Sequence, residues 1–139
     1  MSTRMKRWTW VLLALVVLAA AAVVVLPRLA GSTAGLPAEI DVQRASRLRD
    51  EGAVVLDVRQ PDEWEAGHIP GAVLIPLDQL PARLAEVPKD RAVVVMCRSG
   101  NRSQAGRDIL LQAGYASVTS MAGGIRQWQG AGLPVVSGP

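Results

Sequence analysis

Apolar residues follow two patterns along this chain: one long uncharged run near its start, and short runs separated by polar segments further on. The long run covers residues 8–26, and after Trp10 it consists of Val, Leu and Ala. As a helix, these 19 residues would span about 28 Å, close to the hydrocarbon thickness of a bilayer. Because such a helix has no polar face, it fits lipid better than a protein core. The pattern therefore predicts one transmembrane helix at 8–26.

The residues on either side of this run predict its orientation. Residues 1–7 contain three basic side chains, so we expect this N-terminus in the cytoplasm and everything after the helix outside it, on the periplasmic or cell-surface side. A cleaved signal peptide is the alternative, because Ser32 and Ala34 fit a small-residue cleavage site, and it would give a secreted protein. The run exceeds the usual apolar length of a signal peptide, which favours an uncleaved anchor in the cytoplasmic membrane.

Residues 27–37 contain a Gly- and Ser-bearing stretch and are predicted to be a linker, with one globular domain at 38–139. In the domain, strand and helix patterns alternate, which predicts an α/β fold with a parallel sheet and helices on both faces. The predicted strands are 53–58, 72–75, 92–96 and 117–121. The predicted helices are 41–48, 61–64, 78–85, 103–113 and 124–129.

The continuous apolar run at 92–96 is typical of a central strand covered on both faces, and the only cysteine, Cys97, follows it directly. A free cysteine is often just a small buried apolar residue. The polar loop that follows favours chemistry instead, because arginines and the N–H groups at a helix start stabilise a thiolate. In parallel sheets, ligands bind beyond the carboxyl ends of the strands. The loop comprises Cys97, Arg98, Ser99, Gly100, Asn101, Arg102 and Ser103.

The charge and cysteine content narrow the possible partners. The net charge is +3, but four of the 15 basic residues lie in residues 4–28, so the remaining 11 face all 12 acidic residues. The domain is therefore nearly neutral, which argues against nucleic-acid binding. A single cysteine excludes an intramolecular disulfide and a Cys-rich zinc site. In an exported protein, an unpaired thiol suggests intermolecular pairing or a thiol kept for its reactivity.

Three blocks, in order along residues 40–135, make the chain resemble a single-domain rhodanese, a thiosulfate sulfurtransferase-like family. The blocks are Asp57-Val58-Arg59 with Trp64-Glu65 and Gly67-His68-Ile69-Pro70-Gly71-Ala72, the loop 97–103, and Gly123-Gly124 with Trp128 and Gly132-Leu133-Pro134-Val135. The resemblance implies a twisted five-stranded parallel sheet flanked by helices.

The resemblance also implies a persulfide enzyme that needs neither cofactor nor metal. Cys97 would take sulfur from a small anionic donor such as thiosulfate and pass it to cyanide or a thiol. Arg98 and Arg102 would bind the donor, and we expect Arg102 to contribute more. The remaining residues expected to shape the loop and contact the substrate are Ser99, Gly100, Asn101 and Ser103.

The other residues in these blocks are expected to have structural roles. Asp57 and Arg59 are predicted to fix loops by ion pairing. His68, the only histidine, is predicted to be structural because a thiolate that is already formed needs no base. Trp64 and Trp128 are predicted to be packing anchors.

Two other functions stay open. Phosphatases and arsenate reductases of related fold have Cys-x5-Arg, a loop one residue longer than the Cys-x4-Arg formed here by Cys97 and Arg102. The second alternative is a module that carries sulfur, or binds a partner, without turnover.

Overall fold

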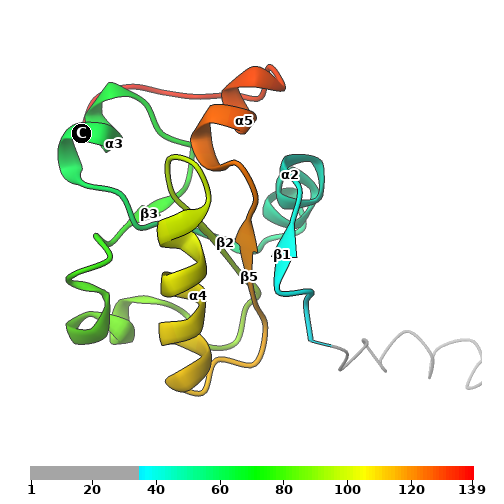
Figure 1. The fold of residues 1–139 in the computed structure, drawn as a ribbon, viewed down its shortest axis with the longest axis vertical. Coiled ribbons are helices and arrows are strands. Elements are labelled where there is room, and N and C mark those ends of the chain that lie inside the picture. The colour runs from blue at the N-terminus through cyan, green and yellow to red at the C-terminus, as the bar shows by residue number, and fades with distance from the viewer. Residues whose placement is uncertain (1–34) are drawn as a thin grey trace, which may run out of the picture. The chain divides into compact units, whose positions relative to one another are not determined.

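The computed structural model describes residues 35–139, so the predicted anchor at 8–26 and most of the predicted linker lie outside the described residues. Five parallel strands form one sheet in the order β1-β5-β4-β2-β3 (Figure 1). The elements are β1 (Glu39–Ile40), α2 (Val42–Asp50), β2 (Val54–Asp57), α3 (Pro61–Ala66), β3 (Val73–Leu74), the 3-10 turns η1 (Leu80–Ala82) and η2 (Leu84–Glu86), β4 (Val93–Met96), α4 (Asn101–Gln112), β5 (Val118–Met121) and α5 (Gly124–Gly130).

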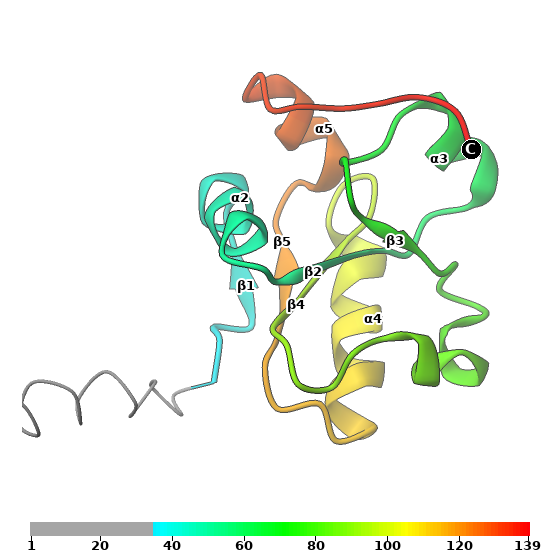
Figure 2. The ribbon, with the colours of Figure 1, turned by 180° about the vertical axis from the view of Figure 1, so that it is seen from behind.

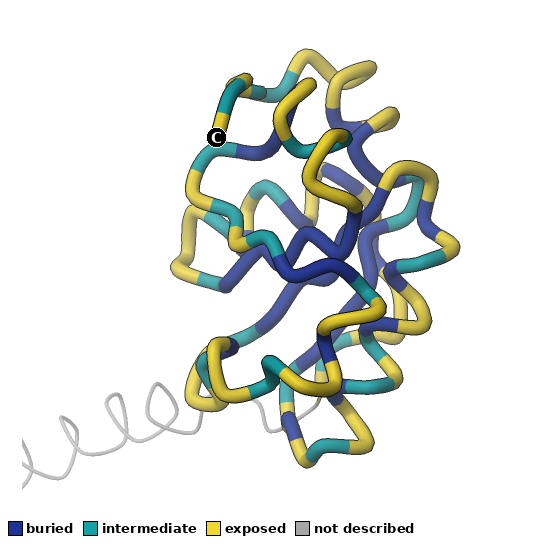
Figure 3. The backbone as a smooth tube through the Cα atoms, turned by 90° about the vertical axis from the view of Figure 1, so that its left-hand side faces the viewer, coloured by how far each residue is buried: buried dark blue, intermediate teal, exposed yellow. Residues whose placement is uncertain are grey.

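Helices cover both faces of the sheet, as the alternating pattern predicts. Figures 1 and 2 show α4 on one face and α2 with α5 on the other. The central strand β4 supplies both cores: Val93 and Val95 pack in the α4-side core with Leu110, whereas Val94 and Met96 pack in the core containing α2 and α5. Every residue of β4 is buried, and Figure 3 shows the buried stretches of the chain gathered in the middle of the domain. This burial explains the uninterrupted apolar sequence of the strand.

The sheet register brings two segments of the predicted site to one edge. Strands β2 and β4 are neighbours and parallel, with Asp57 opposite Met96. Arg59, two residues after β2, and Cys97, directly after β4, therefore lie at the same carboxyl edge of the sheet. This places the first and second sequence blocks side by side, although 38 positions separate Arg59 from Cys97 in the chain.

The predicted helix at 78–85 is wrong: this segment forms η1 and η2 instead. Proline has no N–H to donate to the carbonyl four residues before it, so it interrupts the hydrogen bonds of an α-helix. Pro81 therefore leaves the Leu77 carbonyl without an α-helical partner, and the chain closes 3-10 turns such as Arg83 N–H to the Leu80 carbonyl at 3.1 Å. Leu80 is still fully buried, so the 3-10 turns bury this apolar side chain as an α-helix would have done.

Two further differences concern strand β1 and helix α4. Strand β1 was not predicted, because its two residues are too few to give an alternating pattern. Helix α4 begins at Asn101, two residues earlier than expected, and its buried side is Ser103, Gly106 and Leu110. The helical spacing of Ala105, Ile109 and Leu110 predicts one apolar face, but Ala105 is exposed. None of the helices between residues 35 and 139 is long and apolar enough to cross a membrane.

Candidate active site

Cys97 lies between the end of β4 and the start of α4, in a loop that folds back over its sulfur. The Gly100 N–H donates to the Cys97 Sγ at 3.1 Å. Gly100 has φ 111°, a left-handed conformation that other residues rarely adopt. The Ser103 hydroxyl donates to the Gly100 carbonyl at 2.6 Å, which closes the loop. Cys97 is almost wholly buried, with 1% of its surface exposed.

The hydrogen bonds around the sulfur favour the thiolate. Burial by itself would raise the pKa of the Cys97 thiol, but backbone N–H groups of Gly100, Ser103 and Ser99 outweigh this effect and lower the pKa. The Ser103 hydroxyl acts in the same direction, although its one proton is given to Gly100 in this conformation. These donors lie at the N-terminal end of α4, where the helix dipole also favours negative charge. The loop thus stabilises a nucleophilic sulfur without a neighbouring base.

Arg102 is held by an acidic residue that the sequence analysis did not single out. Its two terminal nitrogens donate to the two carboxylate oxygens of Glu63, in α3, at 2.7 and 2.8 Å. The side chains are 35% and 22% exposed, respectively. Such bidentate pairs are strong and directional. Arg102 was expected to bind the donor more strongly than Arg98, but in this conformation its charge is already balanced.

The Glu63–Arg102 pair makes stability depend on pH. The Arg102 hydrogen bonds lower the pKa of Glu63 from 4.5 to about 2. Because the folded pKa is below the unfolded one, this stabilisation is complete above about pH 4.5 and is lost as pH falls towards 2. Glu63→Gln should therefore lower the free energy of unfolding at pH 7 by about 1–2 kcal/mol, allowing for partial exposure. It should also flatten the dependence of that energy on pH between 4.5 and 2, measured by urea unfolding.

The exposed pair of Arg83 and Glu86 offers a matched control. These side chains make a similar two-bond contact, at 2.7 and 2.8 Å, but on the surface. Glu86→Gln should cost less stability, because solvent screens this pair. Equal losses in the two variants would show that the Glu63–Arg102 contact contributes no more than an ordinary surface ion pair.

Asp57 and Arg59 form a second, buried ion pair at the end of β2. The Arg59 Nη2 lies 2.6 Å from an Asp57 carboxylate oxygen, and both side chains are at most 4% exposed. The same guanidinium donates to the carbonyls of Glu63 at 3.0 Å and Gly67 at 2.8 Å. Arg59 therefore fixes both ends of α3 to the sheet, and with them the carboxylate that holds Arg102.

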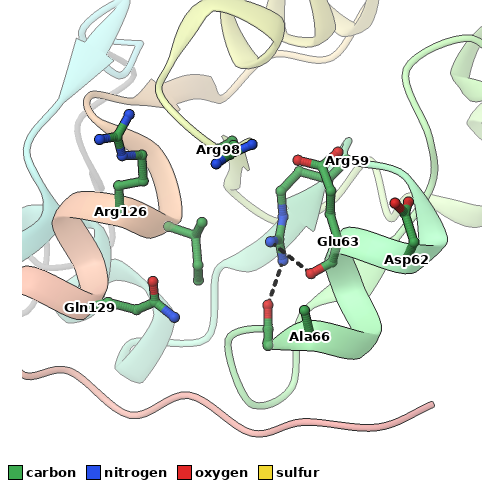
Figure 4. A pocket seen from close by; sticks show the side chains of 9 residues that line it. Arg59, Asp62, Glu63, Ala66, Arg98, Arg126 and Gln129 are labelled. Carbon is green, nitrogen blue, oxygen red and sulfur yellow. Dashed lines mark hydrogen bonds between the residues drawn. The ribbon is translucent and has the colours of Figure 1, made fainter.

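A pocket of about 410 Å³ lies beside this loop, between α3 and α5 (Figure 4). Arg98 and Arg126 line it on the side of the loop and α5, while Asp62 and Glu63 line it on the side of α3. The pocket wall is thus mostly polar and carries both signs of charge. The remaining lining residues are Arg59, Ala66, Gly67, Ile125 and Gln129.

The start of α5 is bonded to the backbone of the cysteine loop. The Ile125 N–H donates to the Cys97 carbonyl at 2.8 Å, and the Arg126 N–H donates to the Arg98 carbonyl at 3.3 Å. Gly124 permits this approach, since a Cβ there would collide with the Cys97 carbonyl oxygen. The third sequence block, which contains Gly124, therefore holds the α5 side of the pocket against the cysteine loop.

His68 and the two tryptophans lie outside the pocket lining. His68 exchanges backbone hydrogen bonds with Val136, at 2.8 and 2.9 Å, and its ring stacks on Trp64 with 3.7 Å between centroids. Trp128 is fully buried and donates its ring N–H to the Pro134 carbonyl at 2.9 Å. The expected packing role of Trp128 is confirmed. His68 ties the C-terminal segment to the region of α3.

The structure brings together several of the residues predicted for the site, and adds others. Arg98 of the cysteine loop and Arg59 of the buried ion pair both line the pocket, and Cys97 directly precedes Arg98 in the loop. Sequence reasoning missed Glu63 and Arg126, whose only sequence signal was proximity to two of the three blocks. Among residues 35–139, no cluster of His, Cys, Asp and Glu side chains could hold a metal ion.

Comparison with known proteins agrees with this geometry. A family model described as Rhodanese-like domain matches residues 41–131. A sulfurtransferase from Allochromatium vinosum is 45% identical over 101 residues, which are 71% of this chain and 94% of that protein. Thiosulfate sulfurtransferase GlpE from Pseudomonas syringae is 36% identical over 90 residues, 65% of this chain and 85% of the relative.

Among solved structures, a rhodanese-related protein from Thermoplasma volcanium matches with a TM-score of 0.67 and 32% identity, covering 72% of this chain and 98% of that one. That protein has the same fold as this chain, so the structural match and the sequence matches indicate the same family. The cysteine loop, the five-stranded parallel sheet and the extent of these matches lead to one conclusion: the chain belongs to the rhodanese-like family.

Proposed function

We propose that this protein is a sulfurtransferase that moves sulfane sulfur from thiosulfate, or a persulfide donor, to a thiol or cyanide through a persulfide on Cys97. One observation carries the proposal: N–H donors lower the pKa of Cys97 next to a pocket lined by guanidinium groups. The activity named for the Pseudomonas syringae relative supports thiosulfate as the donor. The remaining loop residues, Ser99, Asn101 and Ser103, position these N–H groups.

The reaction consists of two exchanges at sulfur. In the first, the Cys97 thiolate attacks the outer sulfur of thiosulfate; a new S–S bond forms, the old one breaks, and sulfite leaves with its electron pair. In the second, a thiolate or cyanide attacks the outer persulfide sulfur, and the electron pair of the broken bond returns to Cys97. No electrons are gained or lost overall. The outer persulfide sulfur is anionic, and loop N–H groups are suitable donors for it.

Two observations favour this reaction over that of a phosphatase. The Cys-x4-Arg loop is shorter than that of the related phosphatases, and its Arg102 is paired with Glu63 rather than free for a phosphate. A sulfur carrier without turnover would use the same persulfide on Cys97, so only the second exchange distinguishes it from an enzyme.

Intact-mass spectrometry tests the first exchange directly. The purified chain, in detergent and treated with thiosulfate, should gain the mass of one sulfur atom, which maps to Cys97. Adding cyanide or a thiol should remove that atom and regenerate the original mass. A persulfide that forms but is not released to any acceptor would point to the carrier function, and no added sulfur would contradict the proposal.

We further propose that the domain is anchored in the cytoplasmic membrane and faces away from the cytoplasm. The support is the uncharged run at 8–26 and the basic residues before it. A reporter that is active only outside the cytoplasm should therefore work when fused after Pro139, and the chain should stay in the membrane fraction. A soluble fragment starting near Gly35 would favour the cleaved signal peptide, and activity only of a cytoplasmic reporter would contradict export.

A further inference from the structure

The arginines around the pocket differ in whether an acidic group balances them. Arg59 is paired with Asp57, and Arg102 is paired with Glu63. Arg98 and Arg126 are exposed, and neither side chain has a hydrogen-bond or ion-pair partner among residues 35–139. Two of the four guanidinium groups in this region are therefore already occupied, and two are free for a ligand.

The backbone keeps the two free arginines close together. The Arg126 N–H donates to the Arg98 carbonyl, which makes the two residues direct neighbours across the contact between α5 and the loop. Both side chains line the same pocket (Figure 4). Arg98 also follows Cys97 directly, and Ile125, the residue before Arg126, bonds to the Cys97 carbonyl. A ligand held by both guanidinium groups would thus lie next to the cysteine.

The acidic side chains that line the pocket leave the positive charges of Arg98 and Arg126 largely unbalanced. Glu63 is engaged with Arg102, so Asp62 is the one lining carboxylate without an ion-pair partner within residues 35–139. Asp62 belongs to α3, on the opposite side of the pocket from α5. Like charges that share one pocket repel each other, and an anion that binds to both relieves the repulsion.

We propose that Arg98 and Arg126 together form the anion clamp that selects a doubly charged sulfur donor, with Arg126 as a specificity-determining residue. The proposal rests on the sulfurtransferase function and adds the residues that choose its donor. A thiolate attacking a dianion brings three negative charges together, which costs free energy unless cations lie beside the donor. Two adjacent forked guanidinium groups suit the three oxygens at the sulfite end of thiosulfate.

The clamp can be tested without sulfur transfer, by alkylating Cys97 with anionic iodoacetate and neutral iodoacetamide. Both reagents react with the same thiolate, so the ratio of their rates reports the positive charge near it and cancels any change in thiol pKa. Arg98→Gln and Arg126→Gln should each lower the iodoacetate-to-iodoacetamide ratio about 2-fold, the effect of one charge at roughly 8 Å in water. The control is Arg91→Gln, which removes an equal charge at the opposite end of β4 and should leave the ratio unchanged.

Thiosulfate kinetics give the second measurement. Each clamp variant should lose roughly 10-fold in kcat/KM, mainly through KM, as expected for a hydrogen bond to a charged group. Thiosulfate kinetics and alkylation ratios that match those of Arg91→Gln would overturn the proposal, and effects confined to Arg98→Gln would remove Arg126 from it. If the intact chain transfers no sulfur but the ratio still falls in both variants, the sulfurtransferase function fails while the anion site stands.

Discussion

Cys97→Ser is expected to abolish thiosulfate-dependent sulfur transfer, with a loss of at least roughly 10³-fold in kcat. Only sulfur at this position can carry the persulfide, and a serine hydroxyl ionises far less readily than the Cys97 thiol, whose pKa the loop lowers. The measurement is thiocyanate formation from thiosulfate and cyanide. In the same variant, the mass increase of one sulfur atom after thiosulfate should disappear.

The fold should survive this substitution, so the loss can be assigned to chemistry. Serine is close to cysteine in size, and its oxygen can still accept the Gly100 N–H that now reaches Sγ. The far-ultraviolet circular dichroism of the variant should therefore match that of the parent. Because Cys97 is the only cysteine, no second thiol can replace it. Turnover that persists in Cys97→Ser would remove the persulfide from the mechanism.

The sequence predicted those parts of the fold that depend on local patterns. The buried run at 92–96 gave the central strand because both faces of β4 are covered by apolar side chains. The helix predicted from position 41 is observed as α2, and the Asp41 carboxylate caps it by accepting the Arg44 N–H at 2.7 Å. The cysteine loop was recognisable for a similar reason: its strand, glycine and helix start are contiguous in the chain.

Features that depend on distant contacts were not predictable in this way. Glu63 and Arg102 are 39 positions apart, and nothing in either local sequence shows that α3 turns its carboxylate towards the loop. Arg126 is one of several exposed arginines, and only its backbone bond to Arg98 distinguishes it. The helix expected at 78–85 is absent for a local reason: Pro81 lacks the N–H that an α-helix needs at this position, and the spacing of apolar residues does not reveal this.

The contact between α5 and the loop explains why glycine occupies both the N-cap, Gly123, and the first position, Gly124, of this helix. Gly123 and Gly124 have φ of 71° and 57°, so both are in the left-handed region. Gly124 additionally lies against the carbonyl groups of Cys97 and Arg98, with no room for a side chain. Its role is therefore steric as well as conformational. The position of the cysteine and the position of the anion clamp both depend on this one contact.

Gly124→Ala should consequently cause a large loss of stability, about 2–4 kcal/mol, from the left-handed backbone and the collision with the Cys97 carbonyl together. Urea unfolding measures this loss. Because relief of the collision must move α5 away from the loop, the hydrogen bonds from Ile125 and Arg126 should weaken, and thiosulfate kcat/KM should fall even in the fraction that remains folded.

Gly130 provides the matched control for this last substitution. It belongs to the same helix, a Cβ there would meet nothing within 4 Å, and its φ is not in the left-handed region. Gly130→Ala should be neutral or stabilise the domain by up to about 1 kcal/mol, through the higher helix propensity of alanine. Equal stabilities of the two variants would mean that α5 yields to a side chain at Gly124 without cost. The Gly100 and Ser103 hydrogen bonds alone would then determine the conformation of the cysteine loop.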